Sequence, residues 1–129
     1  MEDCIFCKIV RGEIPCVKIW EDEKYLAFLD QGQINPGHTL LIPKKHTDYL
    51  FDLQDNEYCE LISKAKEIAK LLKLKLTPKR IGMVVEGFGV AHVHIHLIPI
   101  NNVNELNQER ATYPGIEALK KIAEKILAK

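Results

Sequence analysis

The sequence lacks a net charge of either sign. Its 129 residues include 18 lysines and arginines and 18 aspartates and glutamates, so the formal net charge is zero when the histidines are neutral. No basic tail or patch stands out, which argues against electrostatic binding to a nucleic acid. We therefore expect a small-molecule or locally docked substrate and no nucleic-acid partner.

Long apolar runs are missing as well. No stretch is long enough to cross a membrane, and Glu2 and Asp3 stand where a secretory signal would carry basic residues. We expect a cytoplasmic protein with no membrane partner. Because that compartment is reducing, the four cysteines are not expected to form structural disulfides.

Internal repeats, low-complexity tracts and linkers rich in proline, glycine or serine are also absent. A chain of 129 residues suits one domain with one hydrophobic core. We expect a single domain over residues 1–129, with one functional site rather than a tandem pair.

Short β-type segments follow one another along the chain. Residues 17–20 and 25–29 flank the charged EDEK and predict a hairpin. HTLLIP predicts a mostly buried strand that ends at Pro43. RIGMVVEG and HVHIHLIP predict an antiparallel pair across the glycine-bearing FGVA, and the histidine strand covers residues 92–98. About five strands result.

Two segments have helical periodicity. Apolar residues recur at spacings of three and four from residue 55 to about residue 74, with Asp52 or Asp55 placed to cap the helix and Pro78 to stop it. A second helix is predicted at about residues 114–128, starting at Pro114 and burying Ile116, Leu119, Ile122 and Ile126. The order of elements predicts an α+β domain, an antiparallel sheet with the long helix and the C-terminal helix on one face.

Three of the five histidines occupy every second position of the predicted strand 92–98. In a strand, His92, His94 and His96 would share one face, about 6.5 to 7 Å apart. Bonds from nitrogen to a metal are near 2.1 Å, so three imidazoles on one straight strand could hardly bind a single ion. We expect the three histidines either to have different functions or to bind a larger group, such as a phosphate chain.

Imidazole chemistry suits a phosphate. A neutral imidazole is a nucleophile toward phosphorus, and flanking imidazoles can donate hydrogen bonds to phosphoryl oxygens. A pKa near 6.5 also suits proton delivery to a leaving group at neutral pH. The row therefore predicts a covalent phosphohistidine intermediate.

The pair Cys4 and Cys7 forms a CxxC motif that indicates a metal or redox site. A thioredoxin-like redox role would place the motif at the start of a helix in a βαβ unit, whereas KIVRGEIP and a predicted hairpin follow it, which favours a metal. Structural zinc needs two further ligands from elsewhere in the chain. Cys16 and Cys59 are expected to be plain thiols.

The segment HVHIHLI resembles the HxHxHxx signature of the histidine triad (HIT) superfamily of nucleotide hydrolases and transferases. CIFCKIVRGEIP, YLAFLD and NPGHTLLIPKKH resemble segments of its bacterial members in the same order, so that the resemblance covers residue 4 to about residue 99. It implies a HIT-like fold and attack on the α-phosphorus of a nucleotide. A nucleotidyl-histidine would form, and water would release a nucleoside monophosphate from it.

The resemblance assigns roles at matching positions. It makes His94 the nucleophile, His96 a phosphate contact and His38 a supporting histidine. It also implies that Asp30 binds the ribose hydroxyls. It also implies a structural zinc and no organic cofactor, with the zinc held by Cys4, Cys7, His46 and His92. The competing interpretations are that His38 is a histidine satisfied beside a turn and Asp30 a turn residue after a strand. For the metal set, the alternative is that the two thiols are free and His46 is a surface residue. Ile19, Phe28 and Leu40 are candidates for an apolar slot that takes the base, although packing in the core would explain them equally well.

The sequence departs from the family pattern just before the triad. Many members carry GQSV or GQTV there, whereas this chain has Glu86, Gly87, Phe88, Gly89 and Val90. The hydroxyl that helps to bind the phosphate or the leaving group is therefore missing. Backbone amides near Gly87 and Gly89 could approach a phosphate instead.

The preferred interpretation is a hydrolase of a dinucleoside polyphosphate, with a nucleoside phosphoramidate as the alternative substrate. Two other classes stay open: a nucleotide-binding sensor or interaction module with little turnover, and a metalloenzyme that uses all three triad imidazoles as ligands. The resemblance also implies a homodimer whose sheets join, with the long helix at the interface.

Overall fold

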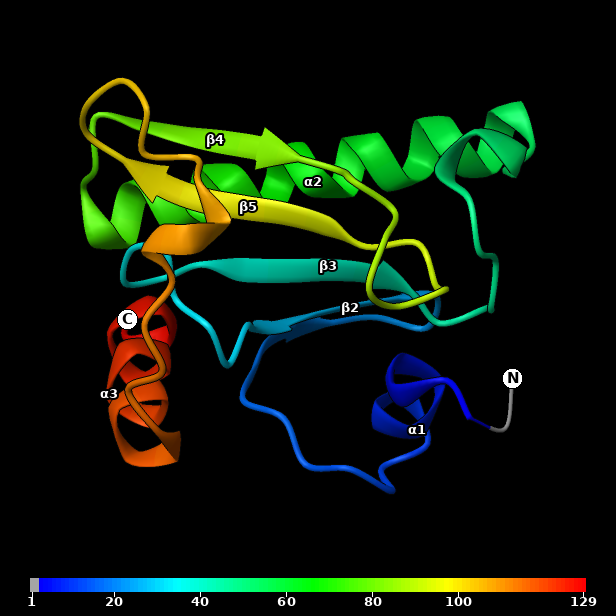
Figure 1. Ribbon diagram of the computed structural model, residues 1–129, viewed down its shortest axis with the longest axis horizontal. Coiled ribbons are helices and arrows are strands. Elements are labelled where there is room, and N and C mark those ends of the chain that lie inside the picture. Colours follow the sequence, from blue (N-terminus) through cyan, green and yellow to red (C-terminus); the bar gives the residue numbers. More distant parts are fainter. Residues whose placement is uncertain (1–2) are drawn as a thin grey trace.

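The computed structural model describes residues 3–129 as one five-stranded antiparallel sheet with helices on both faces (Figure 1). Met1 and Glu2, which belong to the predicted domain, lie outside the described residues. The strands run in the order β1-β2-β3-β5-β4. Their bounds are β1 (Lys18–Glu21), β2 (Tyr25–Leu29), β3 (Thr39–Pro43), β4 (Arg80–Val84) and β5 (Ile95–Ile100). The predicted α+β class is confirmed.

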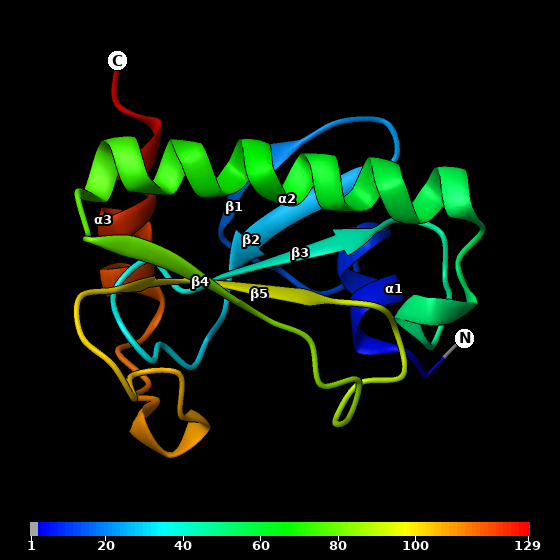
Figure 2. The same cartoon turned by 90° about the horizontal axis from the view of Figure 1, so that it is seen from above.

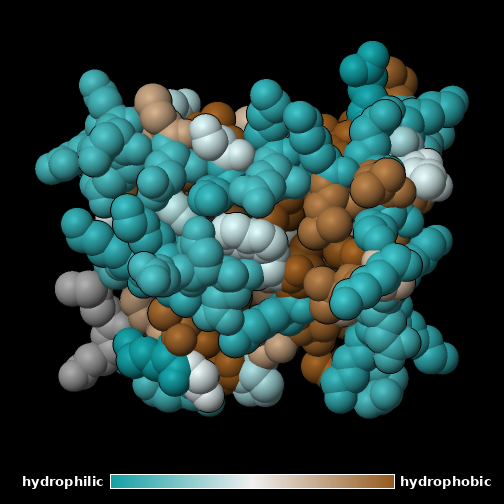
Figure 3. Space-filling model, turned by 180° about the vertical axis from the view of Figure 1, so that it is seen from behind, coloured by the Kyte–Doolittle hydropathy of each residue, from teal (hydrophilic) through white to brown (hydrophobic). Residues whose placement is uncertain are grey.

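The main core lies between the sheet and two helices, α2 (Asp55–Leu76) and α3 (Ile116–Leu127). In Figure 2, α2 runs the length of one face. The buried side chains of α2 recur at helical spacing and pack against the apolar residues that alternate along β3 and β5. These side chains of α2 are Leu61, Ala65, Ile68 and Leu72. Figure 3 shows the molecule from behind the view of Figure 1; this surface is mostly hydrophilic, with apolar side chains exposed in separate patches between the polar ones.

The opposite face carries a short helix, α1 (Ile5–Val10), which the sequence did not predict. Its Phe6 and Ile9 pack on Phe28 and on neighbouring apolar side chains of β2 and β3. The prediction that the helices lie on one face of the sheet is therefore confirmed for α2 and α3 and wrong for α1. Six residues are too few to show a helical period in the sequence.

Several predicted boundaries were wrong. α2 continues to Leu76 instead of about residue 74, and Gln54 precedes it without a side-chain cap, so neither Asp52 nor Asp55 caps it. Thr77, in a left-handed conformation, and then Pro78 end the helix. α3 begins at Ile116 rather than at Pro114, and Ile116 is exposed instead of buried.

The histidine strand is shorter than predicted. β5 begins only at Ile95, so His92 and His94 lie in the connection from β4 and not in a straight strand. Pairing with β3 ends at Leu41 opposite Ile95, and the backbone N–H of Val93 donates instead to the carbonyl of Thr47, 2.7 Å away. That bond turns the chain away from the sheet just before the strand. Within residues 3–129, no helix has the length and apolar character needed to cross a membrane.

Gly37 in the turn before β3 joins the sheet to the end of α2. It has φ of +100°, and a Cβ there would overlap Leu76 and lie 3.0 Å from the ring of Pro99. Gly12 also has a positive φ, +78°, but a Cβ there meets nothing within 4 Å. The two glycines therefore separate backbone strain from steric overlap.

We expect Gly37→Ala to lower the free energy of unfolding by about 3 kcal/mol or more, because it adds overlap to the conformational penalty. Gly12→Ala should cost only the penalty, about 1 to 2 kcal/mol. Urea unfolding of both variants measures the difference. Equal losses would contradict the packing of the turn against Leu76 and Pro99.

Candidate functional site

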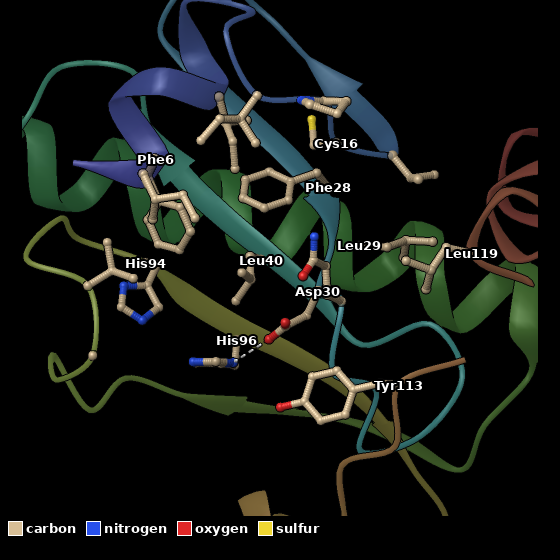
Figure 4. Close-up of a pocket in the computed structure, with 18 of the residues that line it drawn as sticks. Phe6, Cys16, Phe28, Leu29, Asp30, Leu40, His94, His96, Tyr113 and Leu119 are labelled. Atoms are coloured by element: carbon tan, nitrogen blue, oxygen red, sulfur yellow. Dashed lines mark ion pairs between the residues drawn. The ribbon is translucent and has the colours of Figure 1, made fainter. Parts of the chain in front are cut away.

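A cavity of about 550 Å³ opens on the α1 face of the sheet. Phe28, Leu40 and His96 are direct neighbours across β2, β3 and β5, so their side chains share this face. Phe6 from α1 forms a second wall, and Asp30 projects from the end of β2 between them (Figure 4). The alternation of the strands therefore brings one carboxylate, two histidines and an aromatic wall together.

The imidazole of His94 lines this cavity and is 6% exposed. Its Nδ1 lies 2.7 Å from the carbonyl oxygen of His92. A carbonyl oxygen can only accept, so Nδ1 carries the proton and Nε2 keeps its lone pair. The Phe6 ring packs edge-on against the imidazole, with centroids 5.1 Å apart. His94 thus has the tautomer that a nucleophile requires.

His96 has the opposite tautomer, and His38 is the cause. The backbone N–H of Ile34 donates to His38 Nδ1 at 3.2 Å, which leaves the His38 proton on Nε2. That N–H donates to His96 Nδ1 at 2.9 Å. His96 Nε2 must then carry a proton of its own. A hydrogen-bond donor therefore lies beside the lone pair of His94, with ring centroids 5.2 Å apart.

Burial keeps this pair of histidines neutral. Loss of solvent, reinforced by the neighbouring His96, lowers the pKa of His38 to about 3. Loss of solvent and the nearby His94 likewise lower the pKa of His96 to about 4. Both rings are uncharged at neutral pH, which is the state that the relay of hydrogen bonds requires.

Asp30 lies beside His38 and His96, and burial raises the pKa of its carboxyl group. Its Oδ1 accepts from the backbone N–H of Gly32 at 3.1 Å, whereas its Oδ2 lies 3.5 Å from His38 Nε2. Asp30, His38 and His96 are close enough to suggest a metal site. The His38 proton argues against one, because the nitrogen that would bind the ion is the one that donates to His96.

A second cluster lies beside the first and joins Cys4, Cys7, His46 and His92, whose donor atoms all lie within 4.8 Å of one another. The sulfur of Cys7 is 3.2 Å from His46 Nδ1 and 3.5 Å from His92 Nδ1, and the sulfur of Cys4 is 3.4 Å from the latter. Tetrahedral zinc separates a sulfur from a nitrogen ligand by about 3.5 Å. The cluster therefore has the spacing of a zinc site.

The surroundings of His92 also suit a metal. Its Nε2 donates to the carbonyl of Pro43 at 2.8 Å, which leaves the lone pair on Nδ1, facing the thiols. Burial and the adjacent Cys4 raise the pKa of Cys7. The CxxC motif does open a helix after all, since Cys4 is the N-cap of α1, but no βαβ unit follows.

The structure brings together the predicted His38, His94, His96 and Asp30 in one place. Gly89 lines the cavity, whereas Gly87 does not, although both have positive φ. Of the three candidates for the base slot, Phe28 and Leu40 line the cavity, whereas Ile19 belongs to the core under α2, which is the alternative that the sequence left open.

Sequence reasoning missed further cavity residues, and Phe6 is the most informative of them. A signal for Phe6 was available, because it stands between two cysteines expected to share an ion with His92. Most of the others come from two parts of the chain: α1 with the segment that follows it, such as Ile9 and Cys16, and α3 with the segment before it, such as Tyr113 and Leu119. Nothing in their spacing pointed to the cavity.

Comparison with known proteins places these features in a family. Residues 11–103 match the model of the HIT domain. An uncharacterized HIT-like protein of Methanocaldococcus jannaschii is 46% identical over 74% of this chain and 78% of its own length. The adenosine 5′-monophosphoramidase of Schizosaccharomyces pombe is 37% identical over 98% of this chain and 97% of its own. The crystal structure of a zinc-bound histidine triad family protein from Mycobacterium smegmatis is 28% identical, with a TM-score of 0.84 over 98% of this chain and 92% of that one.

Stability should depend on pH through His38 and His96. An unfolded histidine binds a proton near pH 6.5, but these two do so only near pH 3 to 4, so stability present above pH 6.5 is lost as the pH falls. Removal of one group by His38→Asn should reduce the slope between pH 6 and 4.5 by up to about 1.4 kcal/mol per pH unit. Urea unfolding at several pH values, with the same zinc content for both proteins, measures it. Parallel slopes would contradict the relay.

Proposed function

Because the chain belongs to the HIT domain family, we propose that it hydrolyses a nucleotide at the α-phosphorus and releases a nucleoside monophosphate. One observation carries the proposal: His94 and His96 have opposite tautomers in one cavity. The first offers a lone pair on Nε2 and the second an N–H on Nε2. A nucleophile next to a donor is what displacement at a phosphoryl group needs.

The reaction takes two displacements at phosphorus. His94 Nε2 attacks, the bond from phosphorus to the leaving group breaks, and the imidazole becomes a cationic nucleotidyl-histidine. The Nδ1–H bond to the His92 carbonyl strengthens as that charge develops. His96 Nε2–H donates to the phosphoryl group. Water then cleaves the intermediate, which releases the monophosphate and restores neutral His94.

The nucleoside fits the remaining walls. The free Oδ2 of Asp30 can accept hydrogen bonds from the two hydroxyls of a ribose. Phe6, Phe28 and Leu40 supply apolar surface beside it for a base (Figure 4). The α-phosphate of such a nucleotide then lies between Asp30 and His94.

The substrate could carry either of two leaving groups, and the charge of the cavity favours one of them. The sequence favoured a dinucleoside polyphosphate, whose phosphate chain carries several negative charges. Among residues 3–129, no lysine or arginine lines the cavity, whereas Asp30 and Glu86 do. A nucleoside phosphoramidate carries less negative charge, and the similar S. pombe protein is named for that activity. We therefore place the phosphoramidate first.

We further propose that zinc occupies the cluster of Cys4, Cys7, His46 and His92 as a structural ion. Its contribution would be to hold α1 against the chain at His92, and no step of the reaction passes through it. The catalytic residues named above need no organic cofactor. The free thiols of Cys16 and Cys59 suit a reducing, cytoplasmic compartment.

A homodimer is the assembly that we propose. β4 is an edge strand of the sheet, and Met83 on it is exposed. Pairing of two such edges would join the sheets of two copies and bring their α2 helices to the interface.

Replacement of His94 tests the reaction. We expect His94→Ala to reduce monophosphate release from adenosine 5′-phosphoramidate by at least about 1,000-fold, because the nucleophile is lost. His94→Asn, which keeps a donor for the His92 carbonyl, should be as inactive and nearly as stable as the wild type. Rapid denaturation at alkaline pH during turnover should trap a nucleotide on the wild-type chain, detected by mass spectrometry. Equal release by wild type and variants would instead favour a nucleotide sensor with little turnover.

Removal of zinc tests the metal cluster. We expect about one zinc per chain, and a strong chelator should lower the Tm by about 10 °C or more while activity persists until the fold loosens. His46→Ala should lower zinc content and Tm, whereas Cys59→Ser, at an exposed thiol outside the cluster, should change neither. Less than about one zinc per four chains would refute the assignment. Loss of activity at once on chelation would favour the triad as metal ligands.

A further inference from the structure

The loop that precedes the histidine triad in the sequence borders the cavity. It carries two side chains that the proposed reaction does not use. Glu86 and Phe88 both line the cavity, and Phe88 is 83% exposed despite its apolar ring. Phe88 lies between Gly87 and Gly89, which have φ of +83° and +85°. These conformations favour glycine, and neither glycine has a side chain to cover the ring. The loop therefore presents an aromatic ring and a carboxylate to whatever enters.

Glu86 shares two cavities with His96. It lines the main cavity and a smaller one beside it, and His96 lines both. Among the ion pairs of residues 3–129, none involves Glu86. An unpaired carboxylate close to a phosphate site repels the phosphate. A substrate that brings its own positive charge would remove this repulsion.

The side chains that the proposed reaction uses lie on other walls of the cavity. Asp30 and the apolar side chains face the nucleoside, and His94 and His96 face the phosphate. In Figure 4, Phe28 and Cys16 lie on one side of Asp30, and His94 and His96 lie on another. The loop with Glu86 and Phe88 leads into the triad and borders the phosphate site, so the leaving group is the part of a substrate that remains for it.

We propose that Glu86 and Phe88 form a subsite for a positively charged group on the leaving amine. The substrate class is then a nucleoside phosphoramidate whose amine carries a second, cationic group. Glu86 would pair with that cation, and the face of Phe88 would hold it through a cation–π contact. This inference rests on the proposed function and adds the identity of the leaving group to it.

Cleavage of such a substrate balances with water alone. The bond from phosphorus to nitrogen breaks as His94 Nε2 bonds to phosphorus, and the nitrogen leaves as an amine after it takes a proton from solvent. His96 stays neutral and donates a hydrogen bond from Nε2 to the phosphoryl group. Water then splits the nucleotidyl-histidine and returns a proton to solvent. The products are a nucleoside monophosphate and the amine with its cationic group intact.

Three adenosine 5′-phosphoramidates test the subsite, each with a six-carbon amine chain that ends in an ammonium, a methyl or a carboxylate group. The scissile bond is the same in all three. We expect kcat/KM of the wild type to fall in that order, with the ammonium substrate about 10-fold above the carboxylate substrate. That ratio corresponds to two exposed charge interactions, one attractive and one repulsive.

Substitutions assign the preference to the two residues. Glu86→Gln should reduce the ammonium-to-carboxylate ratio to about 2-fold or less, and Phe88→Leu should reduce the ammonium-to-methyl ratio by about 2- to 3-fold. Glu124→Gln on α3 makes the same charge change away from this cavity and should keep the wild-type ratios. Added salt should compress the ratios in the wild type.

The outcomes separate the two proposals. Release of the monophosphate from all three substrates at equal kcat/KM would overturn the cation subsite and leave the proposed function standing. An ammonium preference that Glu86→Gln does not change would also overturn the subsite. Absence of release from every substrate, including the one with a methyl end, would overturn both.

Discussion

One residue, His92, connects the two clusters, and the geometry of both depends on it. Its imidazole faces the thiols of Cys4 and Cys7, while its backbone carbonyl accepts the Nδ1–H of His94. Any shift of His92 therefore changes the ligand set and the orientation of the nucleophile together. Phe6 reinforces the link, because it stands between the two cysteines and packs edge-on against both imidazoles. In the proposed metal-bound protein, zinc would act on catalysis only through this packing and this carbonyl.

The second constraint is the set of proton positions. A backbone N–H at Ile34 determines which nitrogen of His38 is protonated, and His38 determines the same for His96. On the other side, a backbone carbonyl determines the tautomer of His94. The backbone thus prepares a nucleophile and a donor from chemically identical side chains. Burial supports this, because it keeps His38 and His96 neutral and so preserves one lone pair on each ring.

Much of this could be predicted from residue patterns, where local periodicity decides the structure. The continuous apolar runs of β2 and β3 identified two buried strands, and the helical period of α2 identified the long helix and its buried face. The start of β5 could not be predicted, because His92 and His94 alternate as in a strand while Val93 bonds to Thr47, far away in the chain. The tautomer of His96 likewise depends on His38 and Ile34, more than fifty residues earlier, and no spacing encodes it. The ligand and catalytic sets came from a family resemblance, not from periodicity.

The net charge of the sequence is another property that does not predict the site. It could not indicate which leaving group the cavity suits. A chain with equal numbers of acidic and basic residues indicates no polyanionic partner, but it does not tell the sign of any one cavity. Folding places the lysines and arginines away from the catalytic cavity and leaves Asp30 and Glu86 in it. With His96 neutral, nothing permanent in that cavity offsets a polyphosphate chain. In the proposed reaction, the chain would bind phosphate through neutral N–H donors, and neutral donors favour a substrate whose leaving group does not add negative charge.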